Sequence, residues 1–123
     1  MHLNHKNKIQ NVLNTPSGEI IYELIGLGKE SGENPGHSLA QIMIPSGKSS
    51  PLHYHKQSEE TYYILDGTAT MEVDGKEFTL SPGDTLLISA EEQHRITNQE
   101  PGDLEFLAIC VPAWEPEDSY LVE

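Results

Sequence analysis

His53 and His55 are separated by one residue, and side chains of this type at this spacing could have a chemical role. They lie in the run PLHYH, which is typical of a β-strand, and alternate side chains of a strand point to the same face. Two imidazoles on one face can share a divalent metal ion through neutral ring nitrogens. Glu59 and Glu60 begin the following strand-like run and could supply a carboxylate. An isolated His-x-His pair also occurs without a ligand role, and adjacent glutamates are often a solvated surface pair.

The spacing around these histidines resembles the first sequence signature of the cupin superfamily. The positions that match carry two glycines, two histidines and one glutamate. Separated by five, one, four and six residues, they are Gly47, His53, His55, Glu60 and Gly67. The match selects Glu60 rather than its neighbour Glu59 as the acidic member.

A second cupin signature is matched in its spacing further along the chain. It reads Gly83, five residues, Ser89-x-Glu91, two residues, His94, three residues, Asn98. The family has proline and glycine where this chain has Ser89 and Glu91. These two positions form a turn before the strand that carries the histidine. The substitutions therefore bear on the geometry of that turn and not on His94 itself.

The resemblance implies an all-β fold, a double-stranded β-helix or jelly-roll β-barrel in a single domain. Carried over position by position, the metal ligands are His53, His55, Glu60 and His94. They imply one divalent transition metal, Mn, Fe, Ni, Co or Zn, and do not choose among these. Three histidines and one glutamate leave coordination positions open for water or a substrate oxygen.

The elements that must position these residues are short strands from residue 38 onward. Asp-Gly and Pro-Gly pairs separate them, and Asp-Gly between two such runs favours a hairpin. Many short strands with frequent turns predict an antiparallel sandwich or barrel. The expected strands cover residues 38–44, 51–55, 61–66, 68–73, 76–80, 85–88, 94–97 and 104–111.

The chain divides into three parts on this basis. We expect the cupin barrel over residues 38–111. Residues 1–37 form an N-terminal extension and loop that could serve as an edge strand or as a strand exchanged in a dimer. Residues 112–123 form an extended C-terminal tail, interrupted by two prolines.

Other side chains are weaker candidates. Strand alternation from Glu60 places Tyr62 on the metal-facing side, where a core role competes with a role as a proton donor. Gln41 and Met43 share one face of the 38–44 run and are candidates for the mouth of the barrel, although the sequence does not orient that strand. Cys110 lies in an apolar run, which favours a buried and inert thiol.

Charge and composition exclude several classes of function. The chain has 123 residues, with 20 acidic and seven basic side chains and a net charge of −13. Residues 59–123 carry 16 of the acidic groups and two of the basic ones, a net of −14. Such a chain repels phosphate, so we expect no nucleic-acid partner and no anionic membrane partner. Without an apolar leader or a long apolar stretch, the expected location is the cytoplasm.

Two functional hypotheses remain from different classes. The first is a metalloenzyme acting on a small oxygenated metabolite, as a Lewis-acid isomerase, lyase or decarboxylase, or as a dioxygenase. The alternative is a non-catalytic module that binds or senses a small ligand in the same barrel. The chain is similar to small single-domain cupins often labelled sugar-isomerase-like, but its acidic charge does not favour a sugar phosphate, and a neutral or monocarboxylate ligand agrees with the sequence at least as well. The resemblance also implies a homodimer.

Overall fold

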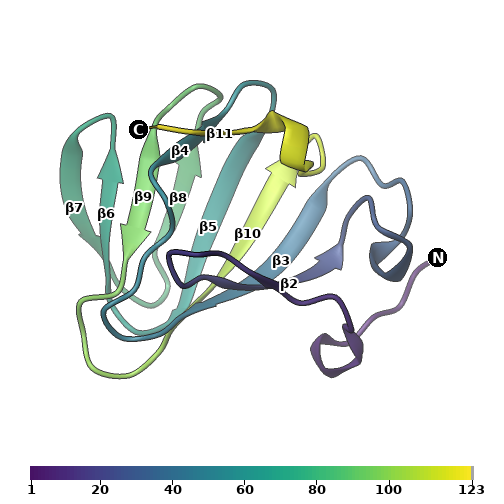
Figure 1. The fold of residues 1–123 in the computed structure, drawn as a ribbon, viewed down its shortest axis with the longest axis horizontal. Helices are drawn as coiled ribbons and strands as arrows, with labels where there is room; N and C mark the ends of the chain where they lie inside the picture. The colour runs from purple at the N-terminus through teal and green to yellow at the C-terminus, as the bar shows by residue number, and fades with distance from the viewer. Residues whose placement is uncertain (123) are drawn as a thin grey trace.

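Two antiparallel β-sheets face each other across one core in the computed structural model, which describes residues 1–122 (Figure 1). The strands are β1 (Leu13–Asn14), β2 (Ile20–Ile25), β3 (Ser38–Ile44), β4 (His53–His55), β5 (Glu59–Asp66), β6 (Ala69–Val73), β7 (Lys76–Leu80), β8 (Thr85–Ile88), β9 (His94–Thr97), β10 (Leu104–Val111) and β11 (Ser119–Leu121). Three short 3-10 helices complete the described chain, η1 (Lys6–Lys8), η2 (Lys29–Ser31) and η3 (Pro116–Asp118).

The order of the strands separates the two sheets. One sheet runs β1-β2-β3-β10-β5-β8 and the other runs β11-β4-β9-β6-β7. The expected all-β jelly roll is confirmed, and its hydrogen bonds divide it into a sandwich of two sheets. Each strand expected from residue 38 onward is present as one of β3 to β10. No helix within residues 1–122 is long and apolar enough to cross a membrane.

Gly67, the last residue of the first signature, has a steric reason for its type. It lies between β5 and β6 with a φ of 87°, in the left-handed region that disfavours other residues. A Cβ atom at this position would lie 2.9 Å from the carbonyl oxygen of Asp103 and 3.1 Å from the Cα of Leu104. The chain therefore reverses here against backbone that leaves no room for a side chain.

The core is filled from both sheets by alternate residues of the strands. Phe106 and Ile64 come from the six-stranded sheet, and Met71 and Ile96 come from the other, all essentially inaccessible to solvent. Burying such side chains stabilises the fold by about 1.5–3 kcal/mol each. This alternation fixes which positions of each strand face inward.

The same alternation corrects one expectation about β3. Gln41 and Met43 do not line the mouth of the cavity, because Ala40 and Ile42 occupy the inward positions of the strand. The Gln41 amide instead donates a hydrogen bond to the carboxylate of Glu105 at 3.1 Å, across to β10.

Both ends of the chain pair with the sandwich. In the 1–37 segment, β1 pairs with β2 and β2 pairs with β3, which widens the six-stranded sheet. In the tail, β11 pairs with β4 and crosses the top of the molecule in Figure 1. The register of this pairing places Ser119 opposite His55 and Leu121 opposite His53. The C-terminal tail therefore reaches the strand that carries the histidine pair.

Candidate metal centre

Four side chains from both sheets converge in the interior. His53 and His55 lie on β4, His94 lies on the neighbouring β9, and Glu60 faces them from β5. One nitrogen or oxygen atom from each lies within 4.8 Å of the others, and all four residues are buried. Strand alternation therefore brings together the four residues that the two signatures indicate.

Each imidazole is fixed through its Nδ1 atom. The Nδ1 atoms of His53, His55 and His94 lie 2.8, 3.1 and 2.9 Å from the carbonyl oxygens of Pro51, Asp118 and Glu92, respectively. A carbonyl oxygen can only accept a hydrogen bond, so each Nδ1 carries a proton, and in the neutral form of each ring the lone pair lies on Nε2. Such contacts set the tautomer and the orientation of histidine ligands in metal sites.

The Nε2 atoms of His55 and His94 lie beside the Glu60 carboxylate. Glu60 Oε1 lies 3.2 Å from His94 Nε2 and 3.4 Å from His55 Nε2. The latter nitrogen is buried and makes no hydrogen bond within the described part of the chain. Lone pairs that face each other at this separation repel unless a proton or a cation lies between them. Imidazole nitrogens and a carboxylate are ligands that suit a divalent transition metal, so these residues fit such an ion.

Burial and mutual charge set the protonation states of the cluster. Burial, and after it the neighbouring His94 ring, lowers the pKa of His53 to about 4, so the His53 imidazole is neutral at pH 7. Burial would also lower the pKa of His55, but its contact with Glu60 outweighs this and holds the pKa above its ordinary value. Burial opposes ionisation of Glu60, yet the two histidines that contact it keep the pKa of this carboxyl far below its usual range. Glu60 is therefore a carboxylate.

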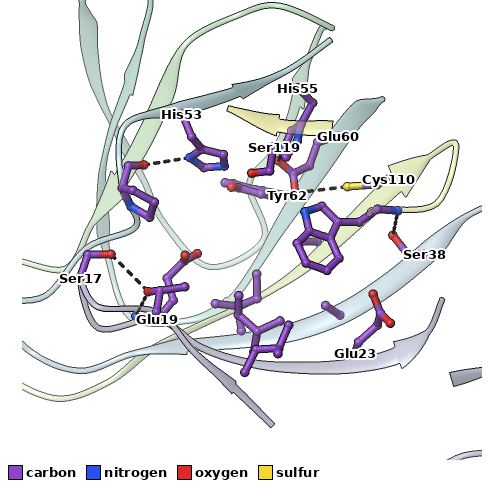
Figure 2. Close-up of a pocket in the computed structure, with 18 of the residues that line it drawn as sticks. Ser17, Glu19, Glu23, Ser38, His53, His55, Glu60, Tyr62, Cys110 and Ser119 are labelled. Atoms are coloured by element: carbon purple, nitrogen blue, oxygen red, sulfur yellow. Dashed lines mark hydrogen bonds and ion pairs between the residues drawn. The ribbon is translucent and has the colours of Figure 1, made fainter. Parts of the chain in front are cut away.

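The cluster opens onto a cavity of about 370 Å³ (Figure 2). Its walls come from β2 to β5, from β10, and from both ends of the chain. Apolar side chains dominate these walls and include Ile21, Ile42, Ala108, Trp114 and Leu121. This volume lies within the range of small-molecule sites.

Tyr62 and Cys110 lie in the cavity wall beside the cluster. The Tyr62 ring centroid is 6.2 Å from that of His94 and 4.8 Å from that of Phe106. Burial and the Glu60 charge raise the Tyr62 pKa well above its ordinary value, so the hydroxyl keeps its proton. Burial also raises the pKa of the Cys110 thiol, which donates a long hydrogen bond of 3.4 Å to Glu60 Oε2. The thiol is thus buried and un-ionised.

The altered turn of the second signature keeps its geometry. Glu91 stands where the family has glycine and adopts a φ of 73°. Its N–H donates a 2.6 Å hydrogen bond to the carbonyl of His55, which ties the turn to β4. The Glu92 carboxylate accepts a hydrogen bond from Ser89 N–H at 2.7 Å. The His94 side chain therefore lies in the cluster despite the two substitutions.

Asp118 is a site residue that the sequence did not reveal. Its buried carboxylate accepts hydrogen bonds from the N–H groups of Lys56, Gln57 and Ser58 at 3.0 to 3.1 Å. Burial would raise the pKa of Asp118, but these hydrogen bonds outweigh it and hold the pKa below its ordinary value. The Asp118 carbonyl fixes His55, so this one residue holds both the ligand and the turn after it.

Glu19 is a second residue that was missed. It lies just before β2, lines the cavity and is only 6% exposed. Burial, together with the negative charge of Glu60, raises the pKa of Glu19 to about 8. Alternation with Ile21 and Glu23 could have placed the three on one face, but no local pattern indicated that this face meets the cluster.

Comparisons with known proteins identify relatives of this chain. The family model described as "Cupin domain" matches residues 40–110. An uncharacterized protein of Methanocaldococcus jannaschii is 36% identical over 109 residues, covering 89% of this chain and 86% of that protein. An oxalate-binding protein of Thermotoga maritima is 36% identical over 85 residues, covering 69% of this chain and 70% of that protein. The crystal structure of a predicted oxalate decarboxylase from Thermotoga maritima superimposes with a TM-score of 0.74 at 29% identity, covering 89% and 98% of the two chains.

Proposed function

This chain belongs to the cupin family, and on that premise we propose that it is a metal-dependent enzyme acting on a small oxygen-containing molecule. His53, His55, Glu60 and His94 would hold one divalent transition metal ion. A bound ion supplies Lewis acidity to a carbonyl or carboxylate oxygen of the substrate. The observation that supports this most strongly is the convergence of three Nε2 lone pairs and one carboxylate beside a cavity.

The cavity is the reason to prefer a working site over a structural one. Structural metal sites are usually closed and rich in cysteine. Here the donor set is histidine and glutamate, and it adjoins about 370 Å³ of space. A molecule of modest size can therefore reach the cluster without unfolding the sandwich.

The protein's own side chains have distinct roles in this proposal. The three imidazoles hold the ion as neutral ligands, and Glu60 reduces the local positive charge. The apolar walls exclude water from the bound molecule. The Tyr62 hydroxyl keeps its proton and lines the cavity, so it is the candidate proton donor for a reacting group held at the cluster.

A non-catalytic binding module is the second candidate. Its likeness to a protein named for binding oxalate favours it. Such a module would retain a specific small molecule through purification and return it unchanged. An enzyme would release a product, so mass spectrometry of the molecule bound before and after incubation separates the two functions.

Elemental analysis of protein purified without a His-tag or added metal tests the metal site. We expect close to one transition-metal ion per chain, lost in the double variant His53→Ala, His94→Ala. His37→Ala is the matched control, because His37 is exposed in a loop outside the cluster. Circular dichroism establishes that each variant keeps its β-sheet content. Folded wild-type protein that takes up no metal after refilling would refute the proposal.

We also propose that the protein is a homodimer. Tyr63 and Leu65 on β5 and Leu87 on β8 point outward and are 41%, 41% and 58% exposed. Because β8 is the outer strand of the six-stranded sheet, a second copy could cover these side chains and the unpaired edge together. Light scattering should give twice the chain mass, and Leu87→Glu should give a monomer. A monomeric wild-type protein at working concentration would contradict this.

A further inference from the structure

Outside the histidines of the cluster, the cavity wall carries no basic side chain. Among the residues that line it are Glu19, Glu23 and Glu60, and none of the lining residues is a lysine or an arginine. The whole chain carries a net charge of −13. Away from the metal cluster, no group of this wall would pair with the charge of a doubly charged anion.

Apolar surface accounts for most of the remaining lining. Ile21, Ile42, Trp114 and Leu121 come from four different parts of the chain and face the same space. Each apolar group of a ligand that replaces water against these walls contributes to affinity. The walls therefore favour a ligand with an apolar body that is larger than a two-carbon acid.

The carboxyl group of Glu19 lies in the cavity wall without a hydrogen-bond partner in the described part of the chain. Its backbone is fixed, because its N–H donates to Thr15 Oγ1 and its carbonyl accepts from Thr15 N–H, both at 3.0 Å. Its side chain rises into the cavity toward His53 in Figure 2. No residue between 1 and 122 donates a hydrogen bond to its carboxyl group. The Glu19 carboxyl group lines the cavity, so a molecule bound there can be its hydrogen-bond partner.

We propose that the cavity selects an uncharged ligand with an apolar body, one oxygen function directed at the metal cluster and a second bonded to Glu19. The proposal rests on the function proposed above, since the cluster holds one end of the ligand. With a pKa near 8, Glu19 carries its proton at neutral pH and donates this hydrogen bond. Glu19 is thus the residue that binds the second oxygen function of the ligand.

Calorimetric titration of the metal-loaded protein at pH 7 with three probes tests this specificity. Benzohydroxamic acid and acetohydroxamic acid carry the same uncharged metal-binding group, one on a phenyl ring and one on a methyl group. Oxalate is the doubly charged probe. We expect benzohydroxamic acid to bind at least tenfold more tightly than either of the others, because its ring replaces water against the apolar walls. Metal content is measured on each sample after titration, so that affinities are compared per bound ion.

Variants of Glu19 isolate its contribution. Glu19→Ala removes the donor and should weaken the binding of 4-hydroxybenzohydroxamic acid, which adds a second oxygen function to the phenyl ring, at least fivefold. Glu19→Gln keeps a donor at the same place and should stay within threefold of the wild type. Glu77→Ala is the control, because this exposed glutamate on β7 lies away from the cavity.

The possible results test this inference and the proposed function separately. Tighter binding of oxalate, or a Glu19→Ala variant with wild-type affinity, would overturn the inference while the metal site stands. A protein that holds no metal and binds none of the three probes would overturn the proposed function itself.

Discussion

Replacing Glu19 by glutamine should remove a pH dependence from the stability of the fold. Burial raises the pKa of this carboxyl to about 8 in the native state. In the unfolded chain a glutamate has an ordinary pKa of about 4.3. Between these two values the native protein binds more protons than the unfolded chain at this position. Its contribution to stability is therefore full below the unfolded pKa and is lost as the pH rises toward 8.

The size of the effect follows from the two pKa values. One proton of difference changes the free energy of unfolding by about 1.4 kcal/mol per pH unit. From pH 5 to pH 7 the Glu19 side chain should lower the stability by roughly 2.5 kcal/mol. The free energy of unfolding of a small domain is about 5–15 kcal/mol, so the change expected here is a large fraction of the total.

Urea unfolding followed by the fluorescence of Trp114 measures this difference. Wild type and Glu19→Gln are compared at pH 5, 6 and 7 in the metal-free form, because a cation beside Glu60 would remove one of the two causes that raise this pKa. Subtracting one series from the other cancels the titration of groups that both proteins share, including His53 and Asp118. We expect the variant to gain stability relative to the wild type with each step in pH, while Glu77→Gln shows no such gain. Parallel stability curves for wild type and Glu19→Gln would refute the reasoning.

Three further changes test other parts of the structure. Asp118→Ala leaves three N–H groups without their acceptor and should cost about 3 kcal/mol in urea unfolding, with metal affinity at least tenfold weaker by calorimetry. Asp118→Asn keeps an acceptor and should lose less in both measurements. Glu91→Gly removes the strain of a side chain in the left-handed region and should raise the free energy of unfolding by about 1 kcal/mol in the same assay. An unchanged free energy of unfolding would mean that Glu91 is not strained in this turn. Removing the metal by chelation should lower the thermal midpoint, and adding it back should restore the midpoint in proportion to free metal; an unchanged midpoint would contradict binding to the native state.

The strands and the cluster were predictable because their signals are local. Alternation within β4 places His53 and His55 on one face, and the same rule along β5 orients Glu60 and Tyr62. Asp-Gly turns mark where the strands end, and Asp74 adopts a φ of 48° in the turn between β6 and β7. These features need no knowledge of distant residues.

The parts that escaped prediction depend on contacts between distant segments. Asp118 contacts His55 and the turn after it although more than 60 residues separate them in the sequence. The residues around either position contain no pattern that predicts this contact. Glu19 owes its burial to the packing of β2 beside the cavity rather than to its neighbours in sequence. Glu91 was hard to predict for another reason. Only the folded turn shows that a residue other than glycine adopts the left-handed conformation at this position.

The link between Asp118 and His55 also orders events in the cell. Synthesis proceeds from the N-terminus, so the histidine pair leaves the ribosome well before the carbonyl that holds one of its members. Until residue 118 has emerged, the His55 ring lacks its anchor and the turn after it lacks its acceptor. The cluster therefore takes its final shape only after this segment has been synthesised.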